Sequence, residues 1–226
     1  MAKAMFDADA LIEMFQTASA KQGAQLQQAT SQAVLAALQG RELSLKNIRG
    51  ALKQVAEAAS AGVAKNLTAG VDPESLLEKA VAGMDEAMLK AVEANRTALA
   101  TLSAQGADLR DKHLQKALGD LEKMEDSLFA AIKKAADGAG APLAGAWGPI
   151  LEKMQAGGTL SGTQAAATAE QLAEQMQTAV RSTRAASMKA AQALAESYTA
   201  MVSGVLLGMS EALQSGGAAR AKTKGK

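Results

Sequence analysis

The side chains that could carry out chemistry are few in this chain, and their spacing matches no catalytic set. His113 is the only histidine and there is no cysteine, so nothing completes a metal site or a nucleophile–base pair around it. The acidic pairs Asp85/Glu86 and Glu125/Asp126 cannot act as carboxylate dyads, because adjacent residues on a helix do not face each other. We therefore expect all five side chains to be solvated, and we predict a protein that is not an enzyme.

No phosphate-binding loop and no nucleophile elbow occurs in the sequence. The predicted catalytic, metal-binding and cofactor-binding sets are consequently empty. Trp147 is the sole tryptophan. It could insert into an interface, where an amphipathic ring is favoured, but we favour the interpretation that it covers the end of a helical hairpin.

The elements that must position these groups are rich in alanine. Alanine accounts for 54 of the 226 residues of the chain, while aromatic residues make up 2%. Alanine loses no side-chain freedom in a helix, but it buries little apolar area. Leucine, methionine and valine recur through it at helical spacing. The pattern predicts an all-α fold whose apolar stripes complete their burial on another helix, on another copy of the chain or on an apolar surface.

Charge and cysteine content limit where such a protein works. The net charge is +1, but four of the 24 basic residues lie in the last seven positions, so the rest of the chain is mildly acidic. The lack of cysteine fits a reducing cytoplasm, and the acids at Asp7, Asp9 and Glu13 argue against a secretory signal. The most apolar stretch, Tyr198–Met209, is shorter than the roughly 20 residues that span a bilayer, so we predict no transmembrane segment.

The periodicity divides the chain into five parts. A helical hairpin is expected over residues 1–71, with helices over 7–39, where Asp7 is the N-cap, and over 43–69. A long central helix is expected over 72–137, because Asp72-Pro73-Glu74 is a strong start signal. The helix could stop and restart at Gly106, but we favour one long helix with a local irregularity there.

The remaining parts are a linker, a helix and a tail. Two prolines and many glycines over 138–162 predict a Gly/Pro linker that interrupts the helices. A long helix is expected over 163–215. The basic tail, 216–226, is expected to be disordered and to make at most weak, sequence-independent contact with phosphates.

These segments predict an elongated antiparallel bundle of alanine-rich amphipathic helices with coiled-coil-like packing. The apolar period differs between segments, which argues against one sustained supercoil. A homo-oligomer is expected, because the large apolar residues are too few for a stable monomer core. The methionines in the stripes suit either an ordinary core or contact with irregular apolar surfaces. The residues we predict to contact an apolar surface or partner are Val81, Met84, Met88, Tyr198, Met201, Val205, Leu206 and Met209.

Long alanine-rich amphipathic helices, absent cysteine, scarce aromatics and a short Ala/Lys/Arg tail resemble the phasins, cytoplasmic bacterial proteins that coat polyhydroxyalkanoate storage granules. The chain is also similar to an uncharacterised group of bacterial all-helical proteins. That second resemblance lies in Gly106-Ala-Asp-Leu-Arg, in the segment 115–126 and in the apolar end around 202–213, and it covers residues 80–214.

The phasin resemblance implies a non-enzymatic protein at the surface of a polymer granule in the cytoplasm, whereas the residues alone imply an apolar surface or partner, such as a polymer or lipid. The alternative is a self-assembling coiled-coil structural or adaptor protein whose stripes are satisfied by helix–helix packing. A nucleoid protein acting through the basic tail is a third, weaker possibility.

Overall fold

The computed structural model confirms the all-α class. It describes residues 7–39, 44–66, 70–104, 116, 119–120, 123–168, 198 and 201–206, and every regular element within these ranges is helical. The helices are α1 (Ala8–Gln16), α2 (Gly23–Leu38), α3 (Leu45–Ala64), α4 (Pro73–Ala104), α6 (Met124–Gly138) and α7 (Ala141–Gly157), with a short 3-10 helix, η1 (Ala20–Gln22), before α2. Residues 160–168 and 201–206 are also helical.

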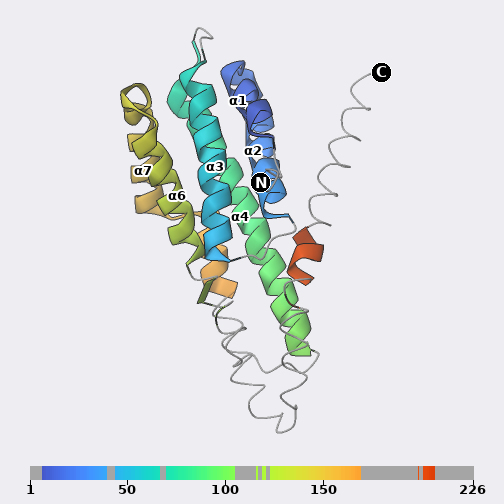
Figure 1. Ribbon diagram of the computed structural model, residues 1–226. Coiled ribbons are helices and arrows are strands. Elements are labelled where there is room, and N and C mark those ends of the chain that lie inside the picture. The colour runs from blue at the N-terminus through green and yellow to red at the C-terminus, as the bar shows by residue number, and fades with distance from the viewer. Residues whose placement is uncertain are drawn as a thin grey trace.

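The helices stack as three neighbouring hairpins, α1–α2, α3–α4 and α6–α7 (Figure 1). The most extensive contacts of α3 are with α1 and α6, whereas α2 packs chiefly on α4, which also contacts α7. The hydrogen bonds Gln27–Glu86 and Ser31–Lys90, both 3.4 Å long, pair residues in the same order along α2 and α4. These two helices therefore run parallel. The expected antiparallel arrangement holds between helices that follow one another in the chain. The contact between α2 and α4, which do not follow one another, is instead parallel.

Two glycines allow the hairpins to approach closely. A Cβ on Gly62 of α3 would lie 2.5 Å from the carbonyl oxygen of Ile12 in α1, and a Cβ on Gly83 of α4 would lie 2.3 Å from that of Gln27 in α2. Neither position has room for any side chain. Close approach of this kind lets alanine-rich faces form a packed core, because interhelical distance depends on side-chain size.

The helix starts follow local sequence signals. The Asp7 carboxylate accepts a hydrogen bond of 3.0 Å from the backbone N–H of Ala10, and Ser44 caps α3 in the same way. Asp72 accepts hydrogen bonds from the N–H groups of Glu74 and Ser75. These contacts satisfy donors that a helix start leaves unpaired, and they confirm the predicted N-cap at Asp7 and the predicted start at Pro73.

The single helix expected over residues 7–39 is instead broken between α1 and η1. Ser19 begins the next element, and its backbone N–H donates to the Gln22 side chain at 2.8 Å, half of a capping box. The side-chain amide of Asn66 donates to the carbonyl oxygens of Phe15 and Ala18, at 2.8 and 3.0 Å. The end of α3 thereby satisfies carbonyl groups that the end of α1 leaves free.

The prediction of one long central helix over 72–137 is wrong for the second half of that range. Both α4 and α6 pack on α3, and they also contact each other, which two halves of one straight helix could not do. The described residues therefore form two separate helices, α4 and α6, where one was expected. Gly106 and His113 lie outside the described residues.

The predicted linker over 138–162 is also wrong, since most of it forms α7. Pro142 lies in the first turn of α7, where a missing N–H costs nothing, and Pro149 is inside the helix with its ring exposed. Leu143, Trp147 and Ile150 are buried, and their spacing is that of one helical face. Glycines with positive φ precede and follow α7 at Gly140 and Gly158, so the interruption is confined to its two ends.

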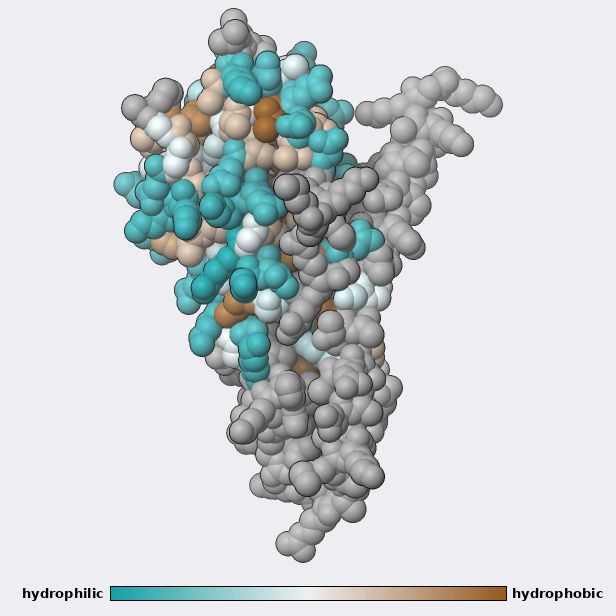
Figure 2. Space-filling model, viewed as in Figure 1, coloured by the Kyte–Doolittle hydropathy of each residue, from teal (hydrophilic) through white to brown (hydrophobic). Residues whose placement is uncertain are grey.

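The core of the described part is closed by intramolecular contacts. Apolar residues at helical spacing along α3 are buried at Ile48, Leu52, Val55, Ala59 and Val63. Within the described ranges, the exposed large apolar side chains are Met14 and Leu160. In the coloured part of the face seen in Figure 2, hydrophilic residues predominate and apolar residues lie among them. The expectation that the stripes find too little cover within one molecule is therefore not met in this part of the chain.

Polar residues inside this core satisfy their hydrogen bonds locally. Thr30 and Ser60 are buried, and each donates to the carbonyl oxygen four residues earlier in its own helix. Because a buried polar group is costly only when unpaired, these positions interrupt the apolar stripes without requiring a partner on another helix.

Candidate functional site

Two of the acidic residues, Asp85 and Glu125, have a structural role. Asp85 of α4 is 9% exposed, and its two carboxylate oxygens each accept one hydrogen bond of 3.0 Å, from the backbone N–H groups of Leu160 and Ser161. Glu125 of α6 accepts from the N–H of Thr159 at 2.7 Å and from its hydroxyl at 3.0 Å. The expectation that both residues are merely solvated is wrong, because both hold the turn that follows α7.

This turn begins the helix over 160–168, and protein groups already occupy its N–H donors. The N–H groups of residues 159–161 donate to the two carboxylates, and the N–H of Gly162 donates to the Thr159 hydroxyl at 3.0 Å. A helix start of this kind often binds an anion, but here carboxylates take that place. Among the described residues, no group of three or more histidine, cysteine or acidic side chains is arranged to hold a metal.

The residues predicted to contact an apolar surface are largely buried in the structure. Met84 and Met88 of α4 are fully buried, and Val81 and Leu206 nearly so. Tyr198, Met201 and Val205 are partly buried and pack against the same core. Met209 lies outside the described residues. All of the described members therefore belong to, or border, one intramolecular cluster rather than an outer face.

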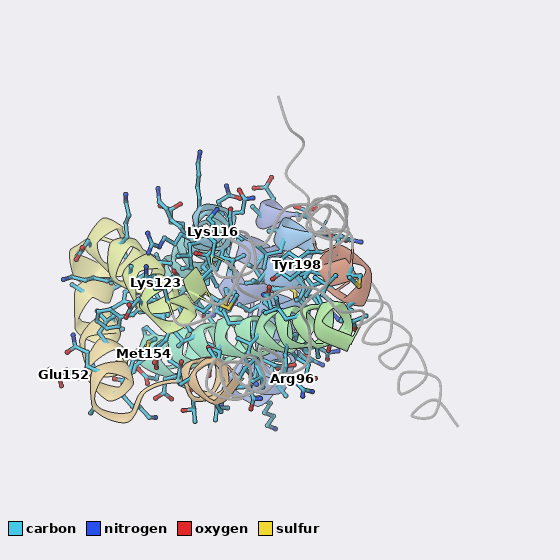
Figure 3. The ribbon with its side chains drawn as sticks, turned by 90° about the horizontal axis from the view of Figure 1, so that it is seen from below. Arg96, Lys116, Lys123, Glu152, Met154 and Tyr198 are labelled. Carbon is cyan, nitrogen blue, oxygen red and sulfur yellow. The ribbon has the colours of Figure 1, made fainter. Side chains whose placement is uncertain are left out.

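The residues 198 and 201–206, which we call the C-terminal strap, lie along α4 (Figure 1). Val202 and Leu206 are its buried anchors. The hydroxyl of Tyr198 hydrogen-bonds to the side-chain oxygen of Asn95, whose amide nitrogen donates to the Ala91 carbonyl at 3.0 Å. Figure 3 shows Tyr198 beside α4 and Arg96 on another side of that helix.

Arg96 forms a separate surface ion pair with Glu93. Its Nε donates to the Glu93 carboxylate at 2.9 Å, and its Nη2 contacts the other carboxylate oxygen. The hydrogen bond from Arg96 lowers the pKa of Glu93 below its ordinary value; partial desolvation opposes this, and the charge of Arg96 adds a smaller lowering. The pair is substantially exposed, so it stabilises α4 locally and marks no reactive group.

A groove of about 410 Å³ runs between α4 and α7. Val81, Ile150 and Met154 contribute apolar surface, and Lys153, at its rim, pairs with Glu78 at 3.1 Å. Figure 3 places Met154 on the side of α7 that faces α4, while Glu152 points away from the helices. Leu160, 73% exposed, also borders the groove. Sequence periodicity does not reveal this groove, because the prolines and glycines of the segment that forms α7 predict a linker.

Trp147 is 1% exposed and lies in the core. It is therefore buried within its own chain, as a residue of α7, while its predicted place over the end of a helical hairpin stays a prediction. Its indole N–H has no hydrogen-bond partner, which is unusual for a buried tryptophan.

Together these features define an all-helical protein, built from stacked hairpins, whose conspicuous acidic residues hold its own backbone. No described helix is both long and apolar enough to cross a membrane. A family model described as "Family of unknown function (DUF6781)" matches residues 1–215, and the chain belongs to that family. No curated protein and no solved structure matches the chain.

Proposed function

We propose that the protein is a non-enzymatic amphipathic-helix protein that coats an apolar surface, with polyhydroxyalkanoate storage granules in the cytoplasm as the leading surface. The closed bundle is then the form the chain takes away from that surface. The observation that supports this most is the composition of the buried cluster: the stripe of α4 and the C-terminal strap supply large apolar side chains to it.

The choice of polymer depends on the resemblance to phasins. The residues themselves support only an apolar surface. Leucine, methionine and valine would lie against it, and the charged outer faces of the helices would stay in water, as in other interfacial amphipathic helices.

Flotation of the purified protein with triolein droplets and with isolated polyhydroxyalkanoate granules tests this function. We expect wild type to float with both, and Val205→Asp to float less because a carboxylate then lies on the apolar side of the strap. Ala156→Asp is the matched control, since Ala156 is exposed on α7 and its substitution adds the same charge on an outer face. Equal flotation of all three proteins, or none by wild type, would contradict the proposal.

A self-assembling structural or adaptor protein is the second candidate. It is favoured by the small number of large apolar side chains that the described part exposes, Met14 and Leu160, since a satisfied core leaves little for a surface to bind. Analytical ultracentrifugation distinguishes the candidates. A stable oligomer that binds no hydrophobic dye and ignores droplets supports this second function over the first.

A further inference from the structure

The C-terminal strap packs an apolar side against the core, and Tyr198 makes a polar contact with α4. Val202 and Leu206 are buried, while Tyr198, Met201 and Val205 are partly exposed at its edges. Its sequence over 201–206, Met-Val-Ser-Gly-Val-Leu, contains a glycine and two β-branched valines, which are weak helix formers. The helical form of the strap therefore depends on an apolar surface against which it can pack.

The polar contact sets the register of the strap on α4. Asn95 is 2% exposed, and its side-chain oxygen accepts the Tyr198 hydroxyl. An apolar droplet or polymer surface could cover Val202 and Leu206 in place of the core, but it cannot replace this hydrogen bond. The Tyr198–Asn95 contact thus favours the docked strap specifically, whereas apolar burial is available in either state.

We propose that the C-terminal strap is a displaceable latch: its apolar side packs either on α4 or on an apolar surface, and Tyr198–Asn95 stabilises the α4-bound state. The inference rests on the proposed function, because it needs an apolar surface as the second partner. Undocking would also uncover the part of α4 around Asn95. The two states exclude each other, since the same side chains serve both.

The lack of cysteine allows a clean test with the full chain. In the double variant Asn95→Cys, Tyr198→Cys, a bismaleimide with a reducible central disulfide would tie the strap to α4, and reduction would free it in the same sample. We expect the tied protein to bind triolein droplets about tenfold or more weakly than the reduced protein. Burial of either anchor alone corresponds to at least that factor in partitioning.

Tyr198→Phe tests the latch without a cross-link. It removes the hydroxyl but keeps the apolar side of the strap, so we expect droplet binding to rise. Ser60→Ala, which removes a hydroxyl bonded within α3, is the matched control and should leave binding unchanged.

The outcomes separate the latch from the surface function. If the tied protein binds droplets as well as the reduced one, or if Tyr198→Phe binds no better than wild type, the latch is wrong while surface coating stands. If no form of the protein binds droplets or polymer, both fall. Weaker binding when tied and stronger binding by Tyr198→Phe together support the latch.

Discussion

Asp85 in α4 and Glu125 in α6 hold the same turn, their carboxylates accepting hydrogen bonds from the backbone of three consecutive residues, 159–161. The two carboxylates thereby fix where the chain leaves α7 relative to both α4 and α6. A Cβ on Gly162 would lie 2.2 Å from the Glu125 carboxyl carbon, so a side chain there would displace the Glu125 carboxylate from the turn.

Replacing Asp85 should destabilise the protein in proportion to the acceptors lost. Asp85→Ala removes both acceptors and leaves two backbone N–H groups at a partly buried site, so we expect a loss of about 1–3 kcal/mol in the free energy of unfolding. Asp85→Asn keeps one acceptor and should lose less. Denaturant unfolding followed by circular dichroism measures both; equal stability of wild type and Asp85→Ala would show that the carboxylate does not stabilise the turn.

The surroundings of Gly83 in α4 and of Gly50 in α3 predict opposite effects when each glycine is replaced by alanine. Gly83→Ala should destabilise by about 1–3 kcal/mol, because its Cβ would overlap the Gln27 carbonyl oxygen and the Thr30 side chain and overpacking of this kind is costly. A Cβ on Gly50 in α3 would meet no atom within 4 Å. Gly50→Ala should therefore stabilise by about 0.5–1 kcal/mol, the ordinary helix preference for alanine.

Comparison of the two thermal unfolding midpoints checks this pair. A gain for both variants would mean that α2 and α4 lie further apart than in the structure. A loss for both would mean that Gly50 has a role that its open surroundings do not explain.

Local signals are sufficient to predict the fold class and several helix ends. Asp7 and Asp72 cap within their own first turns, and the stripe from Ile48 to Val63 needs only periodicity. The sequence does not predict the helix α7, although Leu143, Trp147 and Ile150 have helical spacing. The prolines and glycines around these residues indicate a linker more strongly than three apolar residues indicate a helix. Pro142 at a helix start is nevertheless compatible with a helix.

The parts that could not be predicted depend on contacts between distant residues. Asp85 looks like any surface acid until residues 160–161, about 75 positions later, fold against it. The residues predicted to contact an outer apolar surface, such as Met84 and Met88, occupy helical positions that a core and a surface contact would use equally. Periodicity identifies the apolar side of a helix but does not say what covers it.

The ion pair between Arg96 and Glu93 predicts a small dependence of stability on pH. Because the folded-state pKa of Glu93 is below its ordinary value of 4.5, the contribution is present above that value and is lost as the pH falls through the folded-state pKa. Both side chains are more than a third exposed, so the expected size is under about 1 kcal/mol.

Arg96→Gln tests this dependence directly. The carboxyl of Glu93, followed by NMR, should titrate at a higher pH in the variant, and the small stability difference between the proteins at neutral pH should vanish well below pH 4.5. An unchanged Glu93 titration would mean that Arg96 does not hold the carboxylate in solution.

Trp147 gives a specific signal for the docking of α7. As the sole tryptophan, buried to 1% exposure, it should emit at a blue-shifted wavelength that moves to the red on unfolding. Trp147→Phe should cost less than Trp147→Ala, for which about 3–5 kcal/mol is expected, because the indole N–H makes no hydrogen bond that phenylalanine would lose. Denaturant unfolding followed by circular dichroism ranks the two variants. Solvent-like emission from the native protein, or equal losses for both substitutions, would mean that α7 is not packed on the core as the structure has it.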